Sequence, residues 1–150
     1  MGKVVFRKAL AADLKDIVRL LADDELGWER EVESDLTPYA KTFCLIDQDE
    51  NQMLMVACIE DEIIGTAHLT IIPSLTFVGS IRLNIEAVRI ASSYQGQEFG
   101  TRMIQEAISW GQKKGATIIQ LAANKQRTGV RKFYENLGFK ASHDGMKLYL

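Results

Sequence analysis

The sequence predicts an α+β fold in which a mixed, mostly antiparallel β-sheet is flanked by helices. Three apolar runs rich in β-branched residues, 53–59, 63–72 and 81–90, are separated by short connections, which favours antiparallel neighbours. A long helical pattern then leads into a further apolar run at 117–122. A strand reached through a crossover helix lies parallel to the strand before it, so the predicted sheet is mixed. With 150 residues and 47% hydrophobic content, the chain suits one compact domain over residues 1–150.

The N-terminal elements follow from hydrophobic periodicity. Residues 4–6 are apolar and predict a first strand, and apolar side chains then recur at helical spacing at Leu14, Ile17, Val18 and Leu21. Asp13 and Asp16 fall in the first turn of that helix, where the helix dipole favours carboxylates. Acidic side chains dominate residues 22–35, and we expect an acidic loop or short helix there rather than a core element. The pattern over residues 40–52 leaves the element type open.

The C-terminal half alternates helices and strands. The long helix carries its apolar face on Phe99, Met103, Ile104, Ala107, Ile108 and Gly111. Gly115 is the expected C-terminal cap of this helix. A short helix should start at Thr128 or Gly129 and stop at Gly138, and residues 146–150 predict a last strand.

Composition excludes several classes of function. The net charge of −2 leaves no excess of Lys and Arg to neutralise phosphates, which argues against nucleic acid as a partner. Cys44 and Cys58 lack Cys-x-x-Cys spacing, and we expect buried or half-buried free thiols in a reducing compartment. His68 and His143 lack a partner at metal-ligand or triad spacing, so no metal site is expected and both histidines are assigned to structure.

The chain carries no sequence signal for a membrane. Residues 1–7 acquire charge too early for a signal peptide, and no apolar run approaches the about 18 residues of a membrane-spanning helix. We therefore expect a soluble, cytoplasmic protein without a membrane partner.

A glycine-containing turn between a strand and the long helix is the first candidate binding element. Gly96 and Gly100 lie in this turn, and the first turn of a helix presents unpaired N–H groups and the positive end of its dipole. A phosphate can sit there, because glycines let the backbone approach it closely. The alternative is that the turn is only a tight strand-to-helix connection.

Two motifs resemble the GNAT superfamily of N-acetyltransferases. The turn is similar to the family's Gln/Arg-x-x-Gly-x-Gly/Ala element, which cradles the pyrophosphate of acetyl-CoA, although Glu98 stands where the family has its first glycine. A carboxylate there would repel the pyrophosphate unless it points to water. Residues 133–139 resemble the family's second motif, whose tyrosine lies close to the thioester sulfur. The resemblance covers residues 56–150 and implies the mixed sheet described above.

Two residues are candidates for the proton transfers that such a reaction needs, Tyr134 from the resemblance and Glu86 from its place in the strand. Tyr134 would protonate the departing thiolate, and its alternative role is that of an aromatic core residue. Glu86 is a lone carboxylate in an apolar strand, and burial would make it a stronger base for the acceptor ammonium. Its alternative role is that of a solvent-facing strand residue.

The same resemblance implies a set of cofactor-binding residues. The expected residues are Val88, Arg89, Ile90, Gln95, Gly96, Gln97, Glu98, Phe99, Gly100, Thr101, Asn124, Arg127 and Arg131. The first three would act through the backbone groups of a splayed strand, to which the pantetheine arm of the cofactor bonds as a pseudo-strand. Arg89 is then an exposed charge. Arg127 and Arg131 would meet the 3′-phosphate, or they belong to a solvated helix face.

The implied function is acetyl-CoA-dependent N-acetyl transfer to a primary amine of a small molecule or peptide, by direct attack in a ternary complex. A backbone N–H at Val88 would hold the oxyanion. The rival is a catalytically weak sensor that binds acyl-CoA, or a protein-interaction module, and Glu98 favours it. The acidic residues 23–35 suggest a cationic acceptor, but surface acidity alone explains them equally well. A homodimer is left open.

Overall fold

The computed structural model describes residues 2–23, 26–127 and 129–150. Within the acidic segment, Asp24 and Glu25 lie outside the described residues, as does Thr128 at the expected start of the last helix. The chain divides into two compact units, residues 1–120 and 121–150, and each unit is described by itself.

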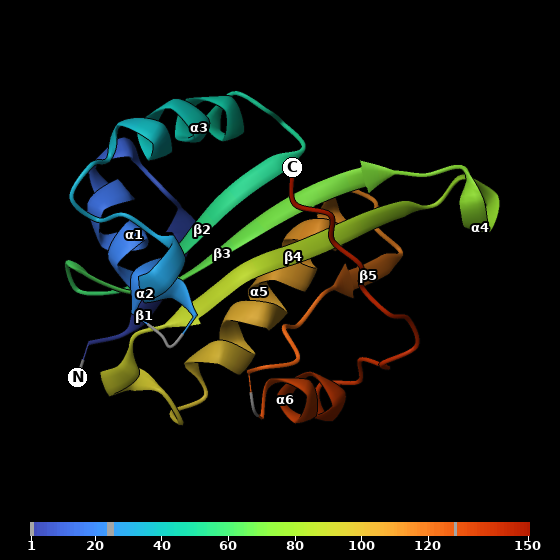
Figure 1. The fold of residues 1–150 in the computed structure, drawn as a ribbon. Helices are drawn as coiled ribbons and strands as arrows, with labels where there is room; N and C mark the ends of the chain where they lie inside the picture. The colour runs from blue at the N-terminus through green and yellow to red at the C-terminus, as the bar shows by residue number, and fades with distance from the viewer. Residues whose placement is uncertain (1, 24–25, 128) are drawn as a thin grey trace. The chain divides into compact units, whose positions relative to one another are not determined.

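The first unit is built on a β-sheet with the expected strands. Its strands are β1 (Val4–Lys8), β2 (Gln52–Ile59), β3 (Glu62–Pro73), β4 (Ile81–Ile90) and β5 (Ile118–Leu121), of which all but the last residue of β5 belong to this unit. They lie side by side in the order β1-β2-β3-β4-β5, as Figure 1 shows. The pairs from β1 to β4 are all antiparallel, as the short connections predict. The predicted fold class, a mostly antiparallel open sheet flanked by helices, is confirmed.

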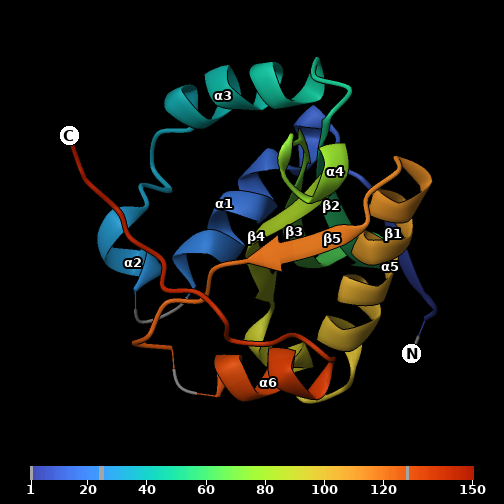
Figure 2. The same ribbon diagram turned by 90° about the vertical axis from the view of Figure 1, so that its right-hand side faces the viewer.

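The last strand, β5, meets β4 at the beginning of both strands. The Thr117 N–H donates to the Ile81 carbonyl oxygen at 3.0 Å, and Figure 2 shows β5 beside β4. Two strands whose beginnings lie together run in the same direction, so this pair has the parallel arrangement expected after a crossover helix. The sheet is therefore mixed, as predicted.

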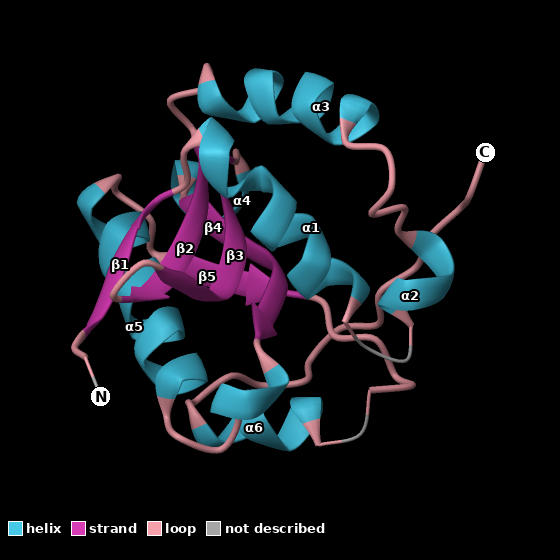
Figure 3. Ribbon diagram, turned by 90° about the vertical axis from the view of Figure 1, so that its left-hand side faces the viewer, coloured by secondary structure: helices cyan, strands magenta, loops and turns pink. Residues whose placement is uncertain are grey.

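Helices cover both faces of this sheet. The helices before β2 are α1 (Leu14–Ala22), α2 (Gly27–Arg30) and α3 (Thr37–Asp47), and those after β3 are α4 (Thr76–Gly79) and α5 (Phe99–Lys113). Figures 1 and 3 show α1 and α3 on one side of the sheet and α5 on the other. The residues left open at 40–52 thus contain the second half of α3, which has a proline in its first turn, where that residue is best tolerated.

The two faces of the sheet have separate cores. On the α1 and α3 side, a cluster of buried residues comprises Ala9, Ile17, Phe43, Val56 and Cys58. On the other side, α5 approaches β4 at Gly111, where an added Cβ would lie 2.7 Å from Cδ2 of Leu83. A larger residue at this position would push the helix away from the strand. Cys58 is buried as expected, whereas Cys44 is exposed because it lies on the outer face of α3.

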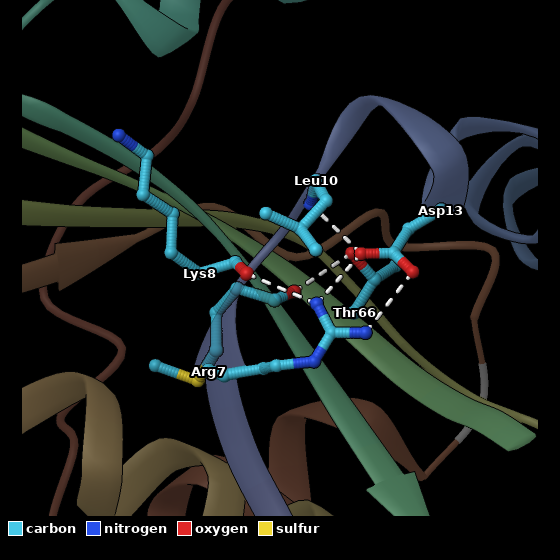
Figure 4. Close-up of polar contacts among 6 residues, drawn as sticks. Arg7, Lys8, Leu10, Asp13 and Thr66 are labelled. Atoms are coloured by element: carbon cyan, nitrogen blue, oxygen red, sulfur yellow. Dashed lines mark hydrogen bonds and ion pairs between the residues drawn. The ribbon is translucent and has the colours of Figure 1, made fainter. Parts of the chain in front are cut away.

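An ion pair closes the connection between β1 and α1. Asp13 ends a short 3₁₀ turn (Ala11–Asp13), and its carboxylate accepts hydrogen bonds from Arg7 and from the Leu10 N–H. Figure 4 shows the carboxylate between the Arg7 guanidinium and this N–H. The two guanidinium nitrogens of Arg7 each donate to one oxygen of Asp13, and this two-point contact, rather than the helix dipole, is the main interaction of the Asp13 carboxylate.

β3 and β4 form a hairpin, and the short helix α4 lies at its tip. Phe77 and Val78 both have left-handed backbone conformations, with φ of 53° and 60°. The Arg82 guanidinium lies over the Phe77 ring, 5.9 Å from its centroid, and donates to the Thr76 hydroxyl at 2.6 Å. These contacts hold the tip of the hairpin in a conformation that residues with a Cβ rarely adopt.

In the described part of the second unit, residues Val130–Asn136 form the helix α6. Gly129 precedes it and Gly138, with φ of 100°, follows its last turn, as the sequence predicts. The predicted last strand is wrong, because residues 139–150 form neither strand nor helix. Met146, Leu148 and Tyr149 are exposed there. Strand propensity in a short run forms a strand only where a neighbouring strand accepts its hydrogen bonds.

No helix within the described residues is long and apolar enough to cross a membrane.

Candidate functional site

Among the described residues, no strand lies beside the second half of β4 on the side away from β3, which leaves an open edge there. β4 has ten residues and β5 has four, and the two strands begin together. Because β5 ends early, the part of β4 from Glu86 to Ile90 extends beyond it on that side. A strand edge without a neighbour presents N–H and C=O groups that an extended ligand can bind.

A β-bulge lies where this open edge begins. Glu86 pairs with His68, but Arg89 pairs with Thr66, so β4 contains one more residue than β3 over this interval. Ala87 has a positive φ of 53°. A bulge of this kind leaves the extra residue outside the ladder and turns the strand. The residues after the bulge therefore face in directions that the alternation up to Glu86 does not predict.

Backbone groups of Val88 and Ile90 face the open edge. The Ala91 N–H donates to Ile64 of β3 at 2.7 Å, and backbone direction alternates along a strand. Val88 and Ile90 consequently turn their backbone groups away from β3. Their carbonyls already accept side-chain hydrogen bonds, from Arg89 Nη1 at 2.9 Å and from Gln95 Nε2 at 3.2 Å. The N–H groups at these two positions are the donors that the edge can offer to a ligand.

Arg89 differs from its expected description. The sequence placed it as an exposed charge, but its side chain is partly buried and folds back onto the Val88 carbonyl. The flexible stem of arginine allows this return, because its charged group needs an acceptor when it is removed from water.

The turn after β4 leads directly into α5. A short 3₁₀ turn (Ser92–Tyr94) is followed by Gly96, with φ of 77°, and by Glu98, with φ of 69°. The helix begins at Phe99, and the Glu98 side chain does not cap it. The N–H groups of Phe99, Gly100 and Thr101 have no acceptor within the helix, since the first bond of the turn is from Arg102 to Glu98. This segment therefore has the unpaired N–H groups that the expected anion seat requires.

The backbone at Glu98 is left-handed, which explains why the family motif has a glycine at this position. Glycine adopts positive φ without steric cost, whereas a residue with a Cβ is strained there by about 1 kcal/mol. Glu98 is exposed, so its carboxylate lies in water at the start of α5. The departure from the motif changes both the local strain and the local charge.

Glu86 is not buried, contrary to the expectation from its apolar strand. Its side chain is 55% exposed, because it faces the side of the sheet opposite Ile85, which packs into the core. Side chains alternate along a strand, and the apolar neighbours of Glu86 belong to the other face. The solvent-facing alternative is therefore correct for its position, and its Oε1 lies 3.7 Å from Nδ1 of His68.

His68 links Glu86 to a third strand. It lies on β3 directly opposite Glu86, and its Nε2 lies 2.8 Å from Oε1 of Gln52 on β2. Burial lowers the pKa of His68 below its usual value, and the nearby Glu86 carboxylate opposes this shift. Spacing along the chain assigned His68 to structure, because its partner Glu86 is brought beside it by strand pairing. Pairing of the predicted strands would have brought residues 68 and 86 close, to within one residue of register.

The remaining expected residues belong to the second unit. Tyr134 is buried and packs edge-to-face with Phe133 and Phe139, at centroid distances of 5.0 and 5.6 Å. Asn124 accepts the Gln126 N–H at 2.8 Å, so its side chain closes a turn. Arg131 pairs with Glu135 at 3.3 Å on an exposed face of α6, and Arg127 is half-buried.

The acidic segment carries a local network. The Tyr39 hydroxyl donates to Glu31 at 3.0 Å and accepts the Val32 N–H at 2.9 Å. Asp23, Glu29 and Glu33 are exposed. Within the described residues, this segment therefore combines a structural carboxylate with several carboxylates that remain in water.

Comparison with known proteins adds to this geometry. The model of the Acetyltransferase (GNAT) family matches residues 14–139. A glucosamine 6-phosphate N-acetyltransferase from Trypanosoma brucei brucei is 33% identical over 88 residues, which cover 59% of this chain and 58% of that enzyme. The chain thus spans less than two thirds of the length of the curated relatives that it matches.

Solved structures show the same architecture. A transcriptional regulator from Bacillus halodurans C-125 is 41% identical with a TM-score of 0.95, over 99% of this chain and 100% of that one. A predicted acetyltransferase from Clostridium acetobutylicum, solved with acetyl-CoA, is 19% identical with a TM-score of 0.77, over 98% of this chain and 96% of that one. At that identity the likeness concerns the fold. The family model covers both motifs and the strands β2 to β5. The chain belongs to the GNAT family of acetyltransferases.

Proposed function

We propose that the chain is an N-acetyltransferase domain that moves an acetyl group from acetyl-CoA to a primary amine. The observation that carries this proposal is the open edge of β4 leading without interruption into the anion seat of α5. An acyl-CoA has an extended arm with amide groups that is joined to a pyrophosphate. A strand edge followed by a helix N-terminus offers the matching groups in the matching order.

The residues of the edge and turn fit this co-substrate. The N–H groups of Val88 and Ile90 would bond to the pantetheine arm, and residues 95–101 would hold the pyrophosphate. At Gly96 an added Cβ would meet no atom within 4 Å, so the space beside the turn is open. Asn124, Arg127 and Arg131 of the second unit are proposed to complete the binding of the nucleotide end, through an amide and two guanidinium groups.

The proposed chemistry needs no covalent bond to the protein. Acetyl-CoA supplies the acetyl group and a thiolate leaving group. Glu86 accepts a proton from the acceptor ammonium through water, which its exposure allows. The N–H of Val88 stabilises the negative charge that develops on the carbonyl oxygen during attack by the amine. Tyr134 donates a proton to the departing sulfur and regains one from the attacking nitrogen.

A cationic small molecule or peptide is the proposed acceptor. The exposed carboxylates of the acidic segment favour a positively charged partner by long-range attraction. The curated relative acts, by its name, on glucosamine 6-phosphate, so amino sugars belong among the candidate acceptors beside polyamines, aminoglycosides and lysine peptides.

A second candidate is a protein that binds acyl-CoA without turnover. Glu98 favours it, because its charge opposes the pyrophosphate, and one solved structure with 41% identity bears the description of a transcriptional regulator. Under this alternative the site residues would bind CoA but would not need to move protons.

One experiment separates the two candidates. Turnover of acetyl-CoA is measured over a library of amines, with release of free thiol as the signal, and CoA affinity is measured by calorimetry. Turnover with at least one amine supports the transferase. Tight CoA binding with no turnover across the library would favour the sensor, and absence of both would contradict either function.

A further inference from the structure

Three polar side chains form a line across β2, β3 and β4, which are neighbours in the sheet (Figure 1). Glu86 Oε1 lies 3.7 Å from His68 Nδ1, and His68 Nε2 lies 2.8 Å from Gln52 Oε1. His68 pairs with Leu54, and Leu54 packs against the core beneath α1 and α3. Side chains of paired residues point to the same face, so the line lies on the α1 and α3 side of the sheet.

The geometry determines which nitrogen of His68 carries the hydrogen. An amide oxygen only accepts hydrogen bonds, so Nε2 donates to Gln52. In the neutral ring Nδ1 then has a lone pair, and this lone pair faces the carboxylate of Glu86. The two atoms are 3.7 Å apart, which is an ion-pair distance and is longer than a hydrogen bond. The arrangement is therefore ready to receive one proton.

We propose that His68 and Glu86 act as one proton-accepting unit in the acetyl transfer, with Gln52 fixing the orientation of the ring. This inference rests on the proposed function. Glu86 takes up, through water, the proton that leaves the acceptor ammonium, and His68 acts through Glu86 as a positioning residue. One proton leaves the ammonium nitrogen, the N–H electron pair remains on the amine, and the proton is accepted by the Glu86 carboxylate, whose Oε1 lies 3.7 Å from His68 Nδ1. It returns to solvent through the exposed carboxylate after the product leaves.

The charge balance around His68 supports this role. Burial lowers its pKa and Glu86 raises it, so the ring is neutral at neutral pH but is drawn toward protonation by its partner. Among the described residues of β2, β3, β4, α1 and α3, Glu86 is the charged group that acts on His68.

The test compares His68→Gln, Glu86→Gln and the double variant, with His143→Gln as the matched control. Glutamine keeps hydrogen-bonding capacity at residue 68 but does not titrate. We expect His68→Gln to lower kcat by about 10- to 100-fold, with the KM for acetyl-CoA unchanged, and to change the acidic limb of the pH profile. The double variant should be no slower than Glu86→Gln alone, because the two groups act as a unit. His143→Gln should behave as the wild type, since residue 143 lies in the exposed C-terminal segment.

A second measurement does not depend on any change at residue 68. The titration of the His68 ring is followed by NMR in the wild type and in Glu86→Gln, and we expect the pKa of His68 to fall when the carboxylate is removed. An unchanged ring titration would overturn the inference, as would wild-type kcat and pH profile in His68→Gln. Losses that multiply in the double variant would overturn it as well. Absence of turnover by the wild type would instead overturn the proposed function, and this inference with it.

Discussion

Arg7 and Asp13 form a two-point ion pair between β1 and the turn that starts α1. Nη1 of Arg7 lies 2.7 Å from Oδ2 of Asp13, and Nη2 lies 3.0 Å from Oδ1. The same carboxylate accepts the Leu10 N–H at 2.8 Å. The carboxylate side chain is 11% exposed, whereas the guanidinium is 36% exposed. The Asp13 carboxylate thus holds both the backbone at Leu10, between β1 and α1, and the guanidinium of Arg7.

Replacement of Asp13 by alanine should destabilise the fold. The change leaves the Arg7 guanidinium and the Leu10 N–H without this acceptor, and we expect a loss of about 1–3 kcal/mol in the free energy of unfolding. Urea unfolding followed by circular dichroism measures this loss. Asp16→Ala is the control, because its pair with Arg19 is exposed and contributes little. Equal effects of the two changes would contradict the assignment.

The same pair predicts a dependence of stability on pH. The hydrogen bond from Arg7 holds the pKa of Asp13 below its usual value of 3.8. A depressed pKa contributes stability above the unfolded value, and this contribution is lost as the pH falls through the folded value. The free energy of unfolding should therefore fall below about pH 4, and Asp13→Asn should show a smaller fall. A slope that is identical in the wild type and this variant would assign the acid sensitivity to other carboxylates.

Two changes at Glu98 separate strain from charge. Glu98→Gly relieves the left-handed backbone and removes the carboxylate, whereas Glu98→Gln removes only the charge. We expect both variants to bind CoA about 2- to 10-fold more tightly at low salt, because a negative charge near the pyrophosphate is lost. Only the glycine variant should gain stability, by about 0.5 kcal/mol, since the entropy cost of glycine offsets part of the relief.

Calorimetry of CoA binding and urea unfolding measure these two effects independently. Unchanged affinity in both variants would mean that the Glu98 side chain lies too far from the phosphates to act on them.

Tyr134 tests the proposed general acid. Tyr134→Phe keeps the ring that packs against Phe133 and Phe139, so the fold should be retained. We expect kcat to fall by about 10- to 10⁴-fold while the affinity for acetyl-CoA changes little, because only the hydroxyl is removed. Steady-state kinetics against thiol release measures this change. Tyr149→Phe is the control, since this tyrosine is exposed near the C-terminus, and a Tyr134→Phe variant at wild-type rate would remove the general acid from the mechanism.

The acidic segment should affect the acceptor and not the co-substrate. Asp23→Asn, Glu29→Gln and Glu33→Gln together remove exposed negative charge without touching Glu31, which bonds to Tyr39. We expect the KM for a cationic acceptor to rise about 2- to 10-fold at low ionic strength and the KM for acetyl-CoA to stay unchanged.

Salt dependence provides the check on this segment. The difference between the triple variant and the wild type should shrink as salt is raised, because exposed charges are screened. A control that neutralises Glu50, Glu106 and Asp144, all exposed and outside the segment, should leave both KM values unchanged. An equal rise for both substrates in the triple variant would instead indicate a structural role.

Local chemistry made much of this protein predictable from its sequence. The turn at Gly96, the helix from residue 99 and its end before Gly115 follow from backbone preferences and side-chain periodicity within a few residues. These features need no knowledge of what packs against them, and the sequence by itself determined the strand-turn-helix element and the family that it resembles.

Which face or edge each residue of β4 takes depends on the pairing register of β3 and β4, and this register is known only from the tertiary structure. The regular pairing from Ile81 onward places Glu86 opposite His68, and the bulge at Ala87 then shifts the pairing by one residue, so that Val88 and Ile90 turn to the open edge. A shift of one residue moves every side chain of a strand to the other face, and spacing along the chain cannot resolve it. The absence of strand in residues 139–150 has the same origin, because a strand exists only where another chain segment accepts its hydrogen bonds.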